Sequence, residues 1–90
     1  MPDLAEYITV EQDKLPFIDA GYGFLFNLRR ITAIFPYKGL APRRLYESKR
    51  DKGLTFDCTR GRKKRSLIVF DTGEIALSAF TPDTLVTNKT

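Results

Sequence analysis

The sequence contains no histidine and a single cysteine, Cys58. These absences remove the usual protein ligands of transition metals and the commonest general base near neutral pH. One thiol also excludes an intramolecular disulfide, which fits a reducing compartment. Acid–base chemistry would fall on eleven carboxylates spread along the chain. We therefore expect no metal, no cofactor and no enzymatic activity.

Membrane and nucleotide-loop signatures are missing as well. No apolar run approaches the ~20 residues that a membrane-spanning helix needs, and the acidic start of the chain lacks the basic and apolar regions of a signal peptide. Gly21, Gly23 and Gly61 do not have the spacing of a phosphate-binding or dinucleotide-binding loop. We predict a cytoplasmic protein without a membrane partner or a small-molecule substrate.

The charge that is present is unevenly distributed. The net charge is +4, but residues 43–65 hold ten basic residues against three acidic ones. Residues 1–19 carry a net charge of −4 and the segment after residue 65 carries −2. A strongly positive middle between two negative ends favours an anionic polymer as the partner.

Ninety residues are enough for one domain with a modest core. Segments rich in β-branched and aromatic residues predict strands, and a glycine-containing turn at 71–74 predicts a hairpin. Pro42 suits the first turn of a helix that Gly53 would end. The expected strands are 17–20, 24–26, 31–35, 54–57, 66–70 and 75–80, with a helix at 42–52. This order indicates an α+β fold built on a small antiparallel sheet with one main helix between strands.

The same pattern suggests how the chain is organised and what forms its core. Residues 1–14 are read as an acidic arm, 15–85 as the domain, and 86–90 as a polar tail, with a turn capped by Thr81 before Pro82. The helix should stay mostly exposed, because it has few apolar residues. Its expected anchors are Leu40, Leu45, Tyr46 and Leu54. The expected core stripes are Phe24/Phe26, Leu67/Val69 and Ile75/Leu77.

The strongest local signal is the tract from Arg60 to Arg65, with five basic residues in six positions. No acidic residue lies within it, Gly61 allows a close backbone approach, and arginine grips phosphate with a planar fork. The alternative to nucleic-acid binding is that the tract is a run of solvated charges or a localisation-like tag. Because the tract leads directly into the predicted hairpin, we expect the fold to hold it as a nucleic-acid-binding surface. The cations of the tract are Arg60, Arg62, Lys63, Lys64 and Arg65.

Other candidates are weaker on residue grounds. Arg43 and Arg44 could touch DNA or form a solvated helix face, and Arg29 and Arg30 could serve a turn. Tyr22, Tyr37 and Tyr46 could stack bases, but they lack the regular strand spacing of an RNA-binding platform. Two alternatives therefore remain beside duplex DNA: RNA, and an acidic protein docked by an adaptor module. Cys58 is expected to be a small buried hydrophobe, and Asp57 a turn or salt-bridge residue.

An ordered set of short pieces resembles the RemA family of bacterial extracellular-matrix regulators over residues 17–85. The pieces are Phe17-Ile18-Asp19-Ala20-Gly21-Tyr22-Gly23, Arg30-Ile31, Arg44, Arg50-Asp51-Lys52-Gly53, Asp57-Cys58-Thr59, Gly61-Arg62-Lys63-Lys64-Arg65, Ile75-Ala76-Leu77-Ser78-Ala79 and Pro82-Asp83-Thr84. The resemblance implies a DNA-binding transcription regulator that assembles into a closed homo-oligomeric ring. It also implies that Arg62, Lys63 and Arg30 are central to DNA contact.

Arg65 and Arg44 match further basic positions of that family pattern. The sequence departs from it at Arg60, where an aromatic residue is usual, at Cys58, where alanine is usual, and at Lys64, which replaces a neutral polar residue. The proline before the helix is shifted by one position. The loop is thus more basic than the family pattern, which favours DNA binding. A ring would repeat this loop and turn weak phosphate contacts into firm attachment.

Overall fold

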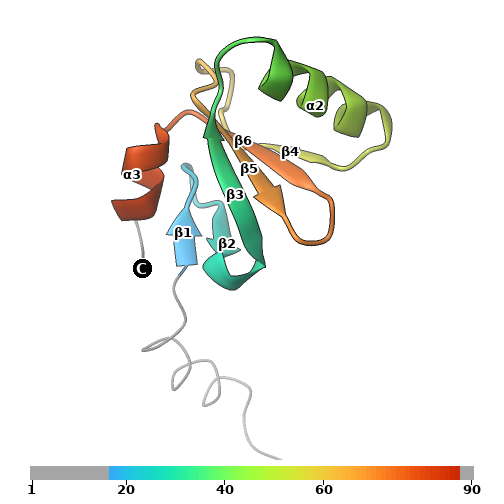
Figure 1. The fold of residues 1–90 in the computed structure, drawn as a ribbon. Helices are drawn as coiled ribbons and strands as arrows, with labels where there is room; N and C mark the ends of the chain where they lie inside the picture. The colour runs from blue at the N-terminus through green and yellow to red at the C-terminus, as the bar shows by residue number, and fades with distance from the viewer. Residues whose placement is uncertain (1–16, 88–90) are drawn as a thin grey trace, which may run out of the picture.

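The computed structural model describes residues 17–87, so the predicted acidic arm at 1–14 and the last residues of the predicted tail lie outside the described part. Within it the chain forms six strands, one main helix and two short helical segments (Figure 1). In chain order these are β1 Phe17–Asp19, β2 Leu25–Asn27, η1 Leu28–Arg30, β3 Ile31–Pro36, α2 Leu40–Asp51, β4 Thr55–Asp57, β5 Ser66–Phe70, β6 Ile75–Ser78 and α3 Pro82–Thr87. None of the helices in residues 17–87 is long and apolar enough to cross a membrane. The α+β class is confirmed.

The central sheet has four strands in the order β3-β5-β6-β4, while β1 and β2 form a separate antiparallel pair. The prediction of an antiparallel sheet is correct for β3–β5 and β5–β6 but wrong for β4, which pairs parallel with β6. The reason lies in the connection after β4. The β4–β5 loop carries the chain across β6 before β5 begins. As a result β4 pairs with β6 and not with β5, the next strand in the sequence. The central sheet is therefore mixed.

Alternating residues of the central strands build two cores, as the period of two along a strand requires. On one face Ile68, Phe70 and Ala76 pack with Ile18 and Leu85, from the β1–β2 pair and α3. On the other face Leu67, Ile75 and Leu77 pack with partly buried side chains that include Leu45 and Tyr46 of α2. The sheet is thus covered on both faces, by α2 on one and by β1–β2 with α3 on the other.

Helix α2 begins at Leu40, two residues before the predicted start, and its N-cap is Gly39. None of its residues is fully buried, as its sparse apolar positions predicted. The predicted anchors Leu45 and Tyr46 are confirmed. Leu40 is not an anchor, because 61% of its surface is exposed. It lies at the helix start, where the first turn extends beyond the sheet.

The two ends of the predicted core also differ from expectation. Phe24 is exposed, because it lies in the β1–β2 turn, where its N–H donates to the Gly21 carbonyl at 3.0 Å. After β6 the chain forms α3, where only a capped turn was predicted. Thr81 does cap it, accepting a hydrogen bond from the Thr84 N–H at 3.3 Å. Leu85 of α3 is fully buried, so this helix belongs to the core.

Candidate nucleic-acid interface

The basic tract lies in the loop between β4 and β5, and the backbone holds it at both ends. The Cys58 N–H donates to the Leu77 carbonyl at 2.9 Å, and the Arg65 N–H donates to the Ser78 carbonyl at 2.9 Å. The Arg65 carbonyl accepts from the Tyr37 N–H at 2.9 Å. The loop is thus tied to β6 and to the end of β3, which confirms that the fold holds its position.

Inside the loop, Asp57 and Thr59 close a tight turn. One Asp57 carboxylate oxygen accepts from the Thr59 N–H at 2.9 Å and from the Thr59 hydroxyl at 2.6 Å. The hydroxyl bond lowers the pKa of Asp57 most, with further lowering by the backbone bond and the positive charge of Lys64. Asp57 is therefore the turn residue that was predicted. A second turn follows at Arg60 and Gly61, both with positive φ, of 51° and 80°.

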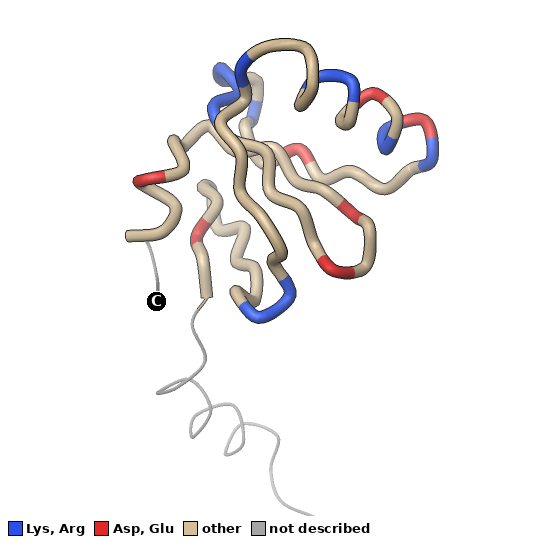
Figure 2. The backbone as a smooth tube through the Cα atoms, in the orientation of Figure 1, with Lys and Arg blue, Asp and Glu red and all other residues tan. Residues whose placement is uncertain are grey.

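The cations of this loop lie at the surface of the subunit. Arg60, Arg62, Lys63 and Arg65 are exposed and Lys64 is partly exposed. Within residues 17–87, none of the five forms an ion pair, since the two ion pairs found are Arg30–Asp71 and Arg43–Glu47. Figure 2 shows these basic positions gathered at one end of the central sheet. Their positive charge is available to an outside anion.

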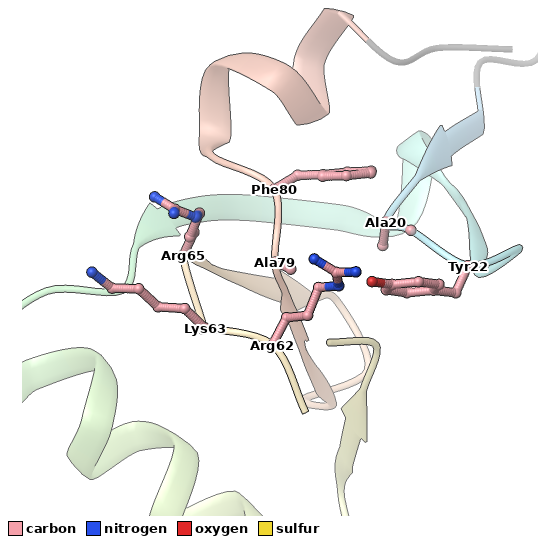
Figure 3. A pocket seen from close by; sticks show the side chains of 8 residues that line it. Ala20, Tyr22, Arg62, Lys63, Arg65, Ala79 and Phe80 are labelled. Atoms are coloured by element: carbon pink, nitrogen blue, oxygen red, sulfur yellow. The ribbon is translucent and has the colours of Figure 1, made fainter. Parts of the chain in front are cut away.

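A hollow of about 560 Å³ opens beside this loop. Its lining combines the loop with the β1–β2 turn and the segment after β6. Figure 3 shows Arg62 pointing toward Tyr22, while Lys63 and Arg65 extend to the other side. Phe80 and Ala79 close the hollow from the segment that leads into α3. The basic surface is thus concave and partly aromatic.

The Arg60 guanidinium lies over the Tyr22 ring, 5.3 Å from its centroid. Tyr22 itself has a φ of 55°. Within residues 17–87, Tyr22 and Arg60 are the two residues other than glycine that adopt a positive φ. Such backbone conformations are costly for a side chain and cluster at ligand-binding sites. A cation–π contact therefore joins the two unusual turns that flank the hollow.

The other predicted site residues lie on elements outside the loop. Arg30 stands at the opposite end of the sheet, where its guanidinium is 3.2 Å from the Asp71 carboxylate. Six residue steps along β5 separate Arg65 from Asp71, about 20 Å of strand at ~3.3 Å per step. Arg43 pairs with Glu47 at 3.3 Å on α2, and Arg44 beside it is exposed. The structure gathers the loop cations and places Arg30 at the opposite end of the sheet, while Arg43 is paired with Glu47 on α2.

Two residues of the interface were not predicted from the sequence. Lys38 is exposed and follows Tyr37, whose N–H is bonded to the Arg65 carbonyl, so this lysine extends the basic surface. Phe80 lines the hollow. The pairing of residues 31–35 with 66–70 was the signal available for Lys38, since antiparallel pairing brings residue 37 beside residue 65. Nothing in the sequence alone indicated Phe80.

Cys58 is fully buried at the base of the loop, as predicted. Burial raises the pKa of its thiol from 9.0 to about 11, with a smaller contribution from the Asp57 charge. Between these two pH values the folded chain holds a proton that the unfolded chain releases. The free energy of unfolding is therefore expected to fall as the pH rises from 9 to 11. Below pH 9 this thiol makes no pH-dependent contribution.

Urea unfolding of the wild type and of Cys58→Ala at pH 7 and pH 10, with reductant present, checks this expectation. The alanine variant removes the titrating thiol but keeps every other group that ionises in this range. The stability of the wild type relative to Cys58→Ala should decrease at pH 10. An identical difference at both pH values would show that the thiol ionises equally well in the folded chain.

Comparison with known proteins places most of the chain in one family. Residues 17–88 match the family described as extracellular matrix regulatory protein A-like, or RemA-like. A protein of Moorella thermoacetica is 35% identical over 71 residues, which cover 79% of this chain and 78% of that protein. One of Carboxydothermus hydrogenoformans is 33% identical over 72 residues, covering 80% and 83%. Both are named "Putative regulatory protein". The chain therefore belongs to the RemA-like family.

Proposed function

We propose that this chain is a cytoplasmic, homo-oligomeric, DNA-binding transcription regulator of the kind that controls extracellular-matrix and biofilm genes. The observation that carries the proposal is the loop of five cations, held by backbone hydrogen bonds and without an ion-pair partner in residues 17–87. Such a surface binds the phosphate backbone of DNA through charge-assisted hydrogen bonds. Membership of a family of regulatory proteins supports the same conclusion.

Arg62 and Lys63 are the main DNA contacts, with Arg60, Lys64 and Arg65 beside them. Arg30 lies about 20 Å from Arg65 along the sheet, as the length of β5 implies. Base pairs rise ~3.4 Å along duplex DNA, so this separation equals about six base pairs. Arg30 and the loop therefore contact different phosphates rather than one. Arg44, exposed on α2, adds a further contact, whereas Arg30 and Arg43 each contribute less because Asp71 and Glu47 offset their charges.

Exposed apolar residues at both edges of the central sheet support assembly. Phe35 of edge strand β3 and Leu40 at the start of α2 are 46% and 61% exposed. Near the other edge strand, β4, Leu25 and Phe56 are 53% and 41% exposed. Exposed large apolar side chains mark protein interfaces. Two different patches on opposite edges suit head-to-tail contacts, which close into a ring when the rotation permits.

Ring assembly repeats the basic loop and raises its effective concentration at the DNA. One loop neutralises only a few phosphates, so a single subunit would bind weakly at physiological salt. Several loops on one rigid ring contact successive phosphates of the same duplex. The proposal therefore requires both the loop and the assembly.

An adaptor module that docks an acidic protein is the second candidate, because the same cations would attract carboxylates. A fluorescently labelled 30-base-pair duplex should bind the full chain, and unlabelled duplex should displace it. Polyglutamate at the same charge concentration should displace it poorly, since its flexible chain does not hold carboxylates in the fixed geometry that phosphates have on a duplex. Equal displacement by polyglutamate would favour the adaptor, and stronger displacement by single-stranded RNA would favour RNA as the partner.

A further inference from the structure

The hollow beside the basic loop has the size of a small-molecule site. Its volume of about 560 Å³ lies within the ~300–1,000 Å³ that is usual for ligand pockets. Three cations enter its lining from the loop: Arg62, Lys63 and Arg65. Two aromatic rings, Tyr22 and Phe80, enter from other segments. The surface that we assign to DNA is thus also a pocket within one subunit.

The lining divides into a charged part and an aromatic part. Lys63 and Arg65 extend to one side of the hollow, and the Tyr22 ring lies on the other side, with Arg62 pointing toward it (Figure 3). The Arg60 guanidinium covers the Tyr22 ring at 5.3 Å from its centroid. Arginine and lysine bind phosphate oxygens, and an aromatic ring stacks on a nucleobase. A molecule with phosphates at one end and a base at the other fits both parts.

Hydrogen bonds and side-chain packing hold the aromatic part of the hollow in place. The buried Ser78 hydroxyl donates to the Ala20 carbonyl at 2.8 Å and accepts from the Phe80 N–H at 3.1 Å. The buried Ser66 hydroxyl donates to the Phe80 carbonyl at 2.6 Å. A methyl group at Gly21 would lie 3.7 Å from the Phe80 ring, so this ring packs over the β1–β2 turn. The pocket is therefore shaped before any ligand arrives, which lowers the cost of binding.

Duplex DNA does not use this aromatic lining. Its bases are stacked and paired inside the helix, and its backbone presents phosphates and sugars to a protein. Tyr22 is nonetheless 45% exposed and is held at a positive φ at the rim of the hollow. A free nucleotide offers an unstacked base to this ring while its phosphates reach the same cations. The aromatic residues thus distinguish a free nucleotide from the duplex.

We propose that the hollow formed by Tyr22, Phe80, Arg62, Lys63 and Arg65 binds a free nucleoside polyphosphate, and that this ligand competes with DNA for the loop cations. The competition rests on the proposed function, whereas the binding of the nucleotide does not. Nucleotide binding neutralises Arg62 and Lys63, so it releases the duplex. The site would couple DNA binding to the nucleotide concentration of the cell.

Calorimetric titration of the full chain with ATP and with GTP, in magnesium-free buffer, tests the binding. At least one of the two should bind. Tyr22→Ala should weaken that binding at least about fivefold, because stacking on an aromatic ring is lost. Tyr22→Phe keeps the ring and should bind as the wild type does. Inorganic tripolyphosphate should bind more weakly than the nucleotide and with equal affinity to the wild type and Tyr22→Ala.

Different results would overturn nucleotide binding in the hollow and DNA binding by the loop. Absence of ATP and GTP binding at millimolar concentration, or equal nucleotide affinity in Tyr22→Ala and the wild type, overturns the pocket. A labelled duplex measured with the same proteins gives the second readout. The nucleotide that binds should displace the labelled duplex from the wild type, because both ligands use Arg62 and Lys63, and a duplex that saturating nucleotide does not displace overturns the competition. A wild type that binds nucleotide but not duplex overturns the proposed function and leaves the pocket standing.

Discussion

Replacing Arg62 and Lys63 together with alanine is expected to weaken duplex-DNA binding by on the order of a hundredfold or more. Each side chain forms a charge-assisted hydrogen bond to phosphate that stabilises the complex by roughly 1.5–3 kcal/mol, and removing both bonds gives this factor. Both side chains are exposed. The backbone hydrogen bonds that hold the loop include the Arg62 N–H, which alanine keeps, and none of them involves either side chain. Folding and assembly should therefore be unchanged. Fluorescence anisotropy with a labelled duplex at 50 mM salt measures the change in affinity.

The matched control is Arg50→Ala with Lys52→Ala, which removes one arginine and one lysine and so the same charge. Both residues are exposed at the end of α2, where they lie outside the β4–β5 loop. A general effect of net charge would weaken DNA binding equally in the two double variants. The assignment of the surface fails if the loop variant binds as the wild type does, or if the control is weakened as much.

The second large effect is expected at the apolar edges of the sheet. Leu40→Asp and Phe56→Asp should each convert the assembly to monomers, because each places a charge in one side of the interface between subunits. Leu40 is 61% exposed and Phe56 41% exposed, so neither side chain belongs to the buried core of the subunit. Size exclusion with light scattering measures the mass. DNA affinity should fall with the assembly, since the loops are no longer linked.

Mixing these two variants gives a sharper result than either alone. In a head-to-tail contact, the Leu40 edge of one subunit meets the Phe56 edge of the next. Each variant keeps one intact edge, so the mixture should form heterodimers and no larger species. An isologous contact would leave the mixture monomeric. Single variants that keep the wild-type mass would show that these edges do not carry the assembly.

The sequence predicted most elements because local signals agree there. Ser66–Phe70 is a strand of β-branched and aromatic residues, and Pro42 and Gly53 bracket the helix that the structure places at Leu40–Asp51. The parallel pairing of β4 was missed, since strand content does not say which strands become neighbours. Phe24 and Leu40 are exposed although they are apolar, because a turn and a helix start place them outside the core.

The site shows the same division between local and non-local information. Five cations in six residues are visible in the sequence, and so is their position before a strand. The separation of Arg30 from the loop depends on the pairing of β3 with β5, which puts residue 31 opposite residue 70. The meeting of Tyr22 with Arg60 depends on how β1–β2 packs on the sheet. Such contacts arise from tertiary packing, and local patterns do not contain them.

The central claim is that a repeated basic loop binds the DNA backbone. The most direct measurement is duplex affinity of the assembled wild type between 50 and 200 mM salt. Six or more phosphate contacts around a ring predict a loss of at least about a thousandfold across this range. An affinity that is independent of salt, or no binding at 50 mM by an assembled protein, would contradict the account.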